Sequence, residues 1–371
     1  MFKKRVLINT GNIHAGGALQ VAISFLTEMI NSDVAYENVT FLISSKIASE
    51  INPDVVTNSK FPIIVKDFYG FNCFFSVLNL IQSNYDVVFT LFGPKYTYFK
   101  ANIDIVGFAQ PWIIDFANPI CNELSFSDRL RLRIKYKIQE FFFKRSDHIV
   151  VELEHVKESL LNVLKVNSDK VSVVYNTLSG LYLNKDSWYN LNFDVDTDYY
   201  SIGLISRAYP HKNIKILPEV SKVLRDFYNL KVKFYLTLTE DEWSSYKNDF
   251  GEFGVSVGPL TVYQCPSFYN KMDAIIFPSL LECFSATPLE ALFMQKPLFA
   301  SDRGFVRDVC KEYAIYFDPL DPNSIASSIA SFINSGYQSI DTALAKNYIL
   351  NFSSSKGRCD SYVNIIKKHS E

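Results

Sequence analysis

The strongest constraint on the fold is an alternation of short apolar runs with helical patterns along the chain. Continuous apolar runs separated by helices argue for parallel sheets that are covered on both faces. A length of 371 residues suits two such domains, each with its own core. We therefore predict an α/β fold with two Rossmann-like parallel-sheet domains. The thirteen predicted strands are 5–9, 39–44, 61–66, 86–91, 103–108, 148–152, 171–175, 199–206, 231–238, 255–257, 273–277, 297–300 and 314–317.

Domain boundaries follow from a change in composition. The stretch from Leu178 to Thr197 is polar, rich in Asn and Asp, and without periodicity, which is typical of a linker. We predict a first domain over residues 1–180, a linker over 181–197 and a second domain over 198–352. The last segment, 353–371, carries a separate helical pattern.

An acidic loop follows the apolar run 273–277. Glu282 and Glu290 are separated by seven residues, and Thr287 and Pro288 are typical of a helix start. One interpretation is that Thr287 and Glu290 form an ordinary capping box. The other is that the helix start binds phosphate, at the strand edge where open α/β sheets hold ligands. A cap does not account for Glu282, so the loop is a candidate site for a nucleotide diphosphate.

A basic loop follows the apolar run 199–206. Arg207 and Lys212 lie on it, before a helical pattern over 214–228. A guanidinium fork and an ammonium group can clamp a diphosphate between them. The alternative is a solvated loop with two surface charges. Because the basic and acidic loops each follow a strand in the same half of the chain, a shared site is favoured.

A third loop, 10–17, contains glycine and precedes a helical pattern over 18–30. Gly16 and Gly17 would allow a ligand to approach the backbone closely at the helix start. The loop lacks a GxGxxG fingerprint and a Walker A lysine, which disfavours a dehydrogenase. His14 lies on this loop, either near a donor or acceptor or as a solvated histidine.

With these anchors, the chain resembles the retaining glycosyltransferases of family 4. The resemblance rests on Gly16-Gly17, on Arg207 and Lys212, and on the Glu282-x7-Glu290 motif. It implies the GT-B fold, with two Rossmann-like domains facing a central cleft and a terminal helix that crosses back to the first domain. The stretches 92–94 and 110–112 are similar to sugar transferases of bacterial surface-polysaccharide assembly, including lipopolysaccharide O-antigen.

The resemblance also implies roles for individual residues. Glu290 would bind the ribose hydroxyls, Arg207 and Lys212 the diphosphate, and Glu282 would face the donor sugar, which makes Glu282, Arg207 and Lys212 the catalytic set. Gln110 stands where many relatives carry a histidine near the sugar. Gln110 and His14 are therefore the candidates nearest the sugar or the acceptor. The implied donor-binding residues are Gly16, Gly17, Arg207, Lys212, Phe284, Ser285, Ala286, Thr287 and Glu290.

Composition restricts the partners and the location. A net charge of −2 disfavours nucleic-acid binding, and six cysteines without paired spacing indicate reduced thiols. There is no signal-peptide pattern and no apolar run long enough to span a membrane. We expect a cytoplasmic protein, free or peripheral on the inner face of the cell membrane.

No metal or other cofactor is expected. Asp194-Val-Asp196 and Asp196-Thr-Asp198 match a metal-binding Asp-x-Asp pattern, but they lie in the polar linker and not at a strand end. The cationic pair and the helix start would then neutralise the leaving diphosphate of a UDP- or GDP-linked sugar.

A basic stretch over residues 128–145 combines seven Lys and Arg residues with an apolar helical stripe at Leu130, Ile134, Ile138 and Phe141. Such a helix can lie on anionic lipid. It can equally pack in the N-terminal domain with its charges in water. Both interpretations remain open at this stage.

The predicted function is a retaining, metal-independent hexosyltransferase. It would move a sugar from a nucleotide-diphosphate donor to a glycan, expected to be a lipid-linked O-antigen, capsule or exopolysaccharide precursor. One alternative is a sugar-nucleotide epimerase of similar fold, which product analysis without acceptor would reveal. The other is a non-catalytic nucleotide-sugar-binding subunit, against which the set Arg207, Lys212, Glu282 and Glu290 argues.

Overall fold

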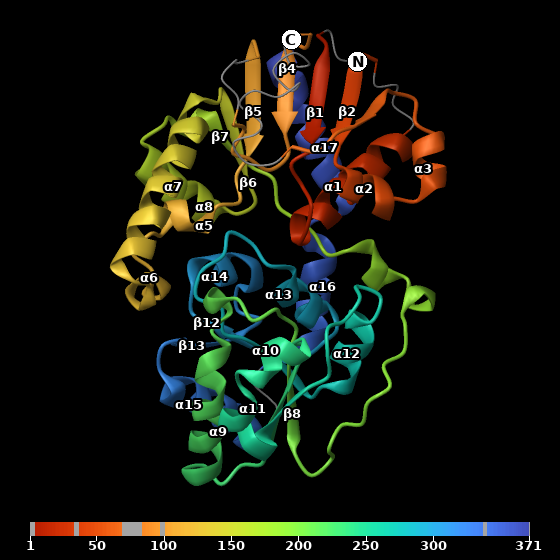
Figure 1. Cartoon of the computed structure of the whole chain (residues 1–371). Coiled ribbons are helices and arrows are strands. Elements are labelled where there is room, and N and C mark those ends of the chain that lie inside the picture. The colour runs from red at the N-terminus through yellow and green to blue at the C-terminus, as the bar shows by residue number, and fades with distance from the viewer. Residues whose placement is uncertain (1–3, 33–36, 69–83, 97–100, 337–339, 371) are drawn as a thin grey trace. The chain divides into compact units, whose positions relative to one another are not determined.

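The computed structural model describes residues 4–32, 37–68, 84–96, 101–336 and 340–370 (Figure 1). The chain divides into two compact units. The first comprises residues 1–116, 125–177 and 353–371, and the second comprises residues 117–124 and 178–352.

The first unit is built on a seven-stranded sheet. Its strands are β1 (Val6–Thr10), β2 (Val39–Ile43), β3 (Ile63–Val65), β4 (Val87–Thr90), β5 (Ile103–Gly107), β6 (His148–Val151) and β7 (Val171–Val173). They are all parallel, in the order β3-β2-β1-β4-β5-β6-β7. Strands β1 and β4 are buried along their whole length, because their apolar side chains are covered on both faces.

The terminal helix completes the core of the first unit. Helices α1 (Gly17–Asn31) and α17 (Ser355–Ser370) pack against each other beside the sheet (Figure 1). The ring of Tyr362 on α17 lies 5.1 Å from that of Phe25 and 5.3 Å from that of Phe89, measured between centroids. The other helices among the described residues of this unit are α2 (Ser45–Glu50), α3 (Pro53–Thr57), α5 (Pro111–Ile114), α7 (Phe126–Arg145) and α8 (Glu154–Leu164), with the 3-10 turn η2 (Ser168–Lys170).

A buried polar cluster also holds α17 in place. Arg358 donates from Nη2 to Ser24 Oγ at 2.8 Å and from Nη1 to Asn176 Oδ1. Asn176 in turn donates to Glu152 Oε1 at 2.8 Å. Since the side chains of Arg358 and Glu152 are both buried, they need hydrogen-bond partners, and this cluster supplies them.

The second unit is built on a six-stranded sheet. Its strands are β8 (Tyr200–Leu204), β9 (Val232–Leu236), β10 (Gly254–Ser256), β11 (Ala274–Phe277), β12 (Leu298–Ser301) and β13 (Ile315–Phe317). They are parallel, in the order β10-β9-β8-β11-β12-β13. In both sheets the first strand lies in the middle and the order reverses beside it, which is the doubly wound topology.

Helices cover the second sheet as well. Among them, α9 (Leu217–Asp226) and α15 (Pro322–Asn334) pack side by side over a core that includes Leu224, Phe234 and Ile329. No helix in the described part of the chain is both long and apolar enough to cross a membrane. The helices are α6 (Pro119–Glu123), α9 (Leu217–Asp226), α10 (Glu240–Ser244), α11 (Lys247–Phe250), α12 (Cys265–Lys271), α13 (Ala286–Phe293), α14 (Gly304–Cys310), α15 (Pro322–Asn334) and α16 (Thr342–Phe352).

The segment expected to be a linker packs on the second unit. It contains the 3-10 turns η3 (Gly180–Leu183) and η4 (Lys185–Ser187) and neither a strand nor an α-helix. Tyr189 stacks on Tyr263 with ring centroids 5.2 Å apart, and Tyr182 is buried. The segment is therefore part of the second unit's surface, and its aromatic side chains anchor it there.

The predicted α/β class with two parallel sheets is confirmed. Each of the thirteen predicted strands is present, with ends within two residues of those predicted. The helical pattern over 214–228 begins instead with the 3-10 turn η6 (Ile214–Ile216), and the α-helix starts at Leu217.

Candidate functional site

The two loops singled out in the second half of the sequence leave neighbouring strands. Strand β8 pairs with β11 in parallel, with Ile202 opposite Ala274. The sheet order reverses between these strands, and doubly wound sheets bind ligands at the carboxyl edge of such a switch point. This adjacency brings the loop with Arg207 and Lys212 next to the loop with Glu282.

Lys212 and Glu282 form an ion pair that joins the two loops. Lys212 Nζ lies 2.7 Å from Glu282 Oε1, and the side chains are only 16% and 11% exposed. The backbone N–H of Leu280 donates to the carbonyl of His211 at 2.7 Å, which fixes the same contact at the backbone level. The carboxylate of Glu282 is thus occupied, and an incoming phosphate oxygen would share Lys212 with it.

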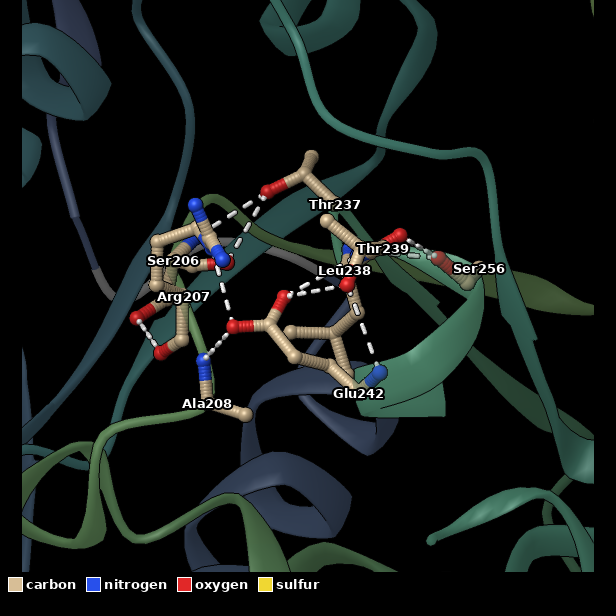
Figure 2. Close-up of polar contacts among 8 residues, drawn as sticks. All are labelled: Ser206, Arg207, Ala208, Thr237, Leu238, Thr239, Glu242 and Ser256. Atoms are coloured by element: carbon tan, nitrogen blue, oxygen red, sulfur yellow. Dashed lines mark hydrogen bonds and ion pairs between the residues drawn. The ribbon is translucent and has the colours of Figure 1, made fainter. Parts of the chain in front are cut away.

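Arg207 is held by an acidic residue that the sequence did not single out. Its Nε donates to Glu242 Oε1 at 2.8 Å, and the same oxygen accepts from the backbone N–H of Ala208 at 3.1 Å (Figure 2). Glu242 is on α10, where it forms a capping box with Thr239. A helix cap and the basic loop are therefore joined through one carboxylate.

The contact orients Arg207 without covering it. The side chain of Arg207 remains 56% exposed, and Nε is the nitrogen that Glu242 engages. Burial alone would raise the pKa of Glu242, but hydrogen bonds from Thr239, Ala208 and Arg207 outweigh it and lower that pKa from 4.5 to about 2. Glu242 is consequently ionised at neutral pH, and the stabilisation it provides is lost only as the pH falls from the usual carboxyl range towards 2.

We expect Glu242→Gln to weaken binding of UDP or GDP about fivefold, because a neutral amide holds Arg207 less firmly than a carboxylate does. Glutamine still serves in a capping box, but the melting temperature at neutral pH should also fall, because the lowered pKa of Glu242 means that its charge stabilises the fold. Isothermal calorimetry with both nucleotides measures the effect. Glu240→Gln on the exposed side of the same helix is the matched control, and equal affinities for the two variants would contradict the role of Glu242.

Glu290 lies in an aromatic surrounding. Its Oε2 accepts a hydrogen bond from the hydroxyl of Tyr269 on α12 at 2.8 Å. Burial raises the pKa of the Glu290 carboxyl, and the hydroxyl groups of Tyr269 and Tyr182 act in the opposite direction. Tyr269 thus holds the carboxylate from inside the protein, and the half-buried carboxylate is a candidate acceptor for a ligand hydroxyl.

The alternative interpretation of Thr287 and Glu290 as a capping box is wrong, and so is the expected helix start at Thr287. Helix α13 begins at Ala286, with Ser285 in the N-cap position and no side-chain cap hydrogen bond. Glu290 is the fifth residue of the helix and lies beyond the first turn. Pro288 is still compatible with this start, because the first-turn N–H groups have no partner within the helix. The capping interpretation of Glu290 is therefore excluded.

The glycines of the first loop belong to the first unit. Gly16 has a φ of 72°, in the left-handed region that favours glycine, and it precedes α1. A Cβ atom placed on Gly16 or Gly17 would meet nothing within 4 Å, whereas one on Gly11 would lie 2.6 Å from the carbonyl of Lys66. Gly11 is therefore needed for packing, and open space lies beside Gly16 and Gly17.

His14 and Gln110 are also in the first unit. His14 Nδ1 lies 3.6 Å from Asp67 Oδ1, and Nε2 lies 3.4 Å from the carbonyl of Phe68. Gln110 occupies the N-cap position of α5, is half-buried and makes no side-chain cap hydrogen bond. His14 thus contacts the loop after β3, and Gln110 lies on the loop after β5.

The Asp-x-Asp residues have other partners. Asp196 Oδ2 lies 3.2 Å from Lys233 Nζ, and the backbone N–H of Asp196 donates to the hydroxyl of Tyr235. Within the described ranges, no three His, Cys, Asp or Glu side chains are grouped so that they could hold a metal ion. No disulfide joins any of the five described cysteines, and Cys73 lies outside the described residues.

The chain shows clear similarity to proteins of known family. Residues 192–349 match the family model Glycosyl transferases group 1, a range that includes Arg207, Lys212, Glu282 and Glu290. The O-antigen chain mannosyltransferase RfbU of Salmonella typhimurium is 27% identical over 212 residues, covering 55% of each chain. An uncharacterized glycosyltransferase of Methanocaldococcus jannaschii is 23% identical over 195 residues, covering 49% of each. The matches thus span about half the length of these curated relatives.

Solved structures share the fold over nearly the whole chain. A glycosyltransferase from Rickettsia africae superposes with a TM-score of 0.69 at 16% identity, covering 99% of both chains. HepE of Anabaena in complex with UDP and glucose gives a TM-score of 0.67 at 12% identity, covering 98% of this chain and 100% of that one. These likenesses confirm the predicted GT-B fold class. Together with the matched region 192–349, they support a glycosyltransferase with the GT-B fold.

Proposed function

We propose that the protein is a retaining, family 4 hexosyltransferase that moves a sugar from a UDP- or GDP-linked donor to a lipid-linked glycan acceptor. The product would be an O-antigen, capsule or exopolysaccharide precursor, made at the inner face of the cell membrane. The observation that carries the proposal is the joining of the basic and acidic loops at the switch point of the second sheet, through Lys212 and Glu282. The family match over the same residues supports it.

The donor assignment follows from the charges at this edge. Arg207 and Lys212 supply two cations, and Arg207 is exposed and oriented by Glu242. Glu290 supplies a carboxylate that suits a ribose hydroxyl donor. The complex of HepE with UDP and glucose, and the mannosyltransferase name of RfbU, support a nucleotide sugar and a surface glycan respectively.

The proposed chemistry needs charge stabilisation more than a nucleophile. The bond between the anomeric carbon and the β-phosphate oxygen breaks, and the diphosphate leaves with the electron pair. The acceptor oxygen then bonds to the same face of the sugar, and its proton passes to a phosphate oxygen. Lys212 and Arg207 stabilise the charge that grows on the diphosphate. Because Glu282 is paired with Lys212, we assign it to orient that lysine and face the donor sugar.

The function is tested with purified protein and a panel of UDP- and GDP-sugars. Donors that bind should raise the melting temperature by mass action. Those donors are then incubated with synthetic polyprenyl-diphosphate-linked saccharides, and NMR of the product gives the anomeric configuration. Inversion would exclude the retaining assignment. A changed sugar nucleotide in the absence of acceptor would identify an epimerase, and binding without any turnover would favour a non-catalytic subunit.

We expect turnover to persist in excess EDTA. The expectation rests on the engagement of Asp196 by Lys233 and on the two cations available to the diphosphate. Initial rates measured with EDTA, and after adding back manganese or magnesium, should agree within error. A rate that vanishes with EDTA and returns with either ion would contradict the metal-independent mechanism.

A further inference from the structure

One face of α7 exposes a row of large apolar side chains. Phe126, Leu130, Ile134 and Phe141 are 83%, 48%, 54% and 54% exposed. Spacings of four, four and seven residues place them on the same side of the helix. We call this row, with the interleaved basic residues Arg133, Lys137 and Lys144, the α7 face. Leu130, Ile134 and Phe141 line one shallow hollow together with Arg133, Lys137 and Ile138.

The opposite side of α7 attaches the helix to its unit. Tyr136, Gln139, Phe142 and Phe143 are buried there, and the ring of Phe143 lies 4.8 Å from that of Phe108, measured between centroids. The packing of α7 is therefore satisfied without the α7 face. The exposed apolar side chains of this row do not contribute to the core of the first unit.

The charge of α7 differs sharply from that of the whole chain. The helix carries seven Lys and Arg residues and two acids, a net charge of +5, whereas the chain as a whole carries −2. One acid, Glu140, is buried and is held by Lys137 at 2.7 Å and Lys144 at 2.9 Å. The other, Asp128, lies in the first turn. The α7 face is thus both apolar and strongly basic.

We propose that the α7 face docks on an anionic lipid surface. Apolar side chains would enter the headgroup boundary, while Arg133 and Lys137 extend along it to reach lipid phosphates. Charge decides between the possible occupants: a second copy of the chain would bring one basic face against another, whereas acidic headgroups complement it. The function of this docking rests on the proposed lipid-linked acceptor. Docking would hold the first unit at the membrane surface where such an acceptor lies.

Vesicle co-sedimentation of the full chain tests the proposal. We expect binding to phosphatidylcholine vesicles that contain phosphatidylglycerol, and much weaker binding to phosphatidylcholine alone. Binding should fall as salt is raised from about 0.05 M to about 0.5 M, because surface attraction is screened. Arg133→Ser with Lys137→Ser should weaken partitioning about 30-fold, and Leu130→Ser with Ile134→Ser should also weaken it strongly. Lys222→Ser with Lys247→Ser, which removes two exposed charges from the second unit, should leave it unchanged.

Three results would overturn the proposal. The first is equal binding of the protein to both vesicle types. The second is a loss of vesicle binding in Lys222→Ser with Lys247→Ser as large as that in the α7 variants. The third is the absence of vesicle binding together with a dimer in solution that Leu130→Ser with Ile134→Ser dissociates. Affinity for UDP and GDP, measured on the same variants without lipid, should stay at the wild-type value. Lipid binding is measured without donor or acceptor. It can therefore fail while nucleotide binding and transfer persist, which separates this proposal from the proposed function.

Discussion

Lys212→Ala should weaken the binding of UDP or GDP at least 30-fold, to the point where calorimetry detects little heat. The variant loses a charge-assisted contact to the diphosphate, which is worth about 2 kcal/mol or more. It should also lower the stability of the second unit by about 3 kcal/mol, because Glu282 is left mostly buried without its partner. Calorimetry and thermal unfolding of the same preparation measure both effects.

A double variant separates binding from folding. Lys212→Ala with Glu282→Gln removes the unpaired charge, so the melting temperature should recover while nucleotide affinity should not. Lys215→Ala is the matched control, since Lys215 is three residues away, 55% exposed and paired with Glu123. Recovery of affinity in the double variant would mean that Lys212 acts only by holding the two loops together.

Glu290→Gln should raise the donor KM about tenfold without lowering the melting temperature of the free protein. The amide oxygen can still accept from the Tyr269 hydroxyl, so the internal hydrogen bond survives. A ribose hydroxyl that donates to a carboxylate loses its charge-assisted partner, which accounts for the larger KM. Donor kinetics and apo unfolding are measured on the same variant. Wild-type values in both would reduce Glu290 to an internal acceptor for Tyr269.

The pH dependence provides an independent check on Glu290. Burial raises the pKa of this carboxyl. As the pH is lowered, Glu290 should therefore become protonated, and donor affinity should fall, at a higher pH than for an ordinary carboxyl group. The stability of the fold has the opposite pH dependence. Because the folded-state pKa of Glu290 is raised, its contribution to the free energy of unfolding is full below the usual carboxyl pKa and is lost as the pH rises through the folded-state pKa. Glu290→Gln should remove this step from the pH profile of donor KM.

The sequence predicted the fold because the relevant signals are local. Each strand of both sheets is a short apolar run, and parallel strands covered on both faces need that composition. The sequence also predicted that Arg207, Lys212 and Glu282 would share an edge. They follow strands β8 and β11, and the doubly wound order makes these two strands neighbours.

The local residue pattern at the start of α13 did not predict the first residue of that helix correctly. Thr287, Pro288 and Glu290 have the residue types of a capped helix start, yet the helix begins at Ala286 without a side-chain cap. Proline is tolerated throughout a first helical turn, so it does not fix the first residue. The residue types of this stretch were therefore insufficient to predict the helix start.

The residues that hold the site in place were decided by the tertiary structure alone. Glu242 is 35 positions from Arg207, and Tyr269 is 21 positions from Glu290. Neither lies in a motif with its partner, and Tyr182 comes from a segment that looked like a linker. Composition and periodicity indicate which side chains are buried or exposed, but not which residues far apart in the sequence are in contact. These contacts depend on how α10 and α12 pack beside the sheet, and packing is a property of the whole folded unit.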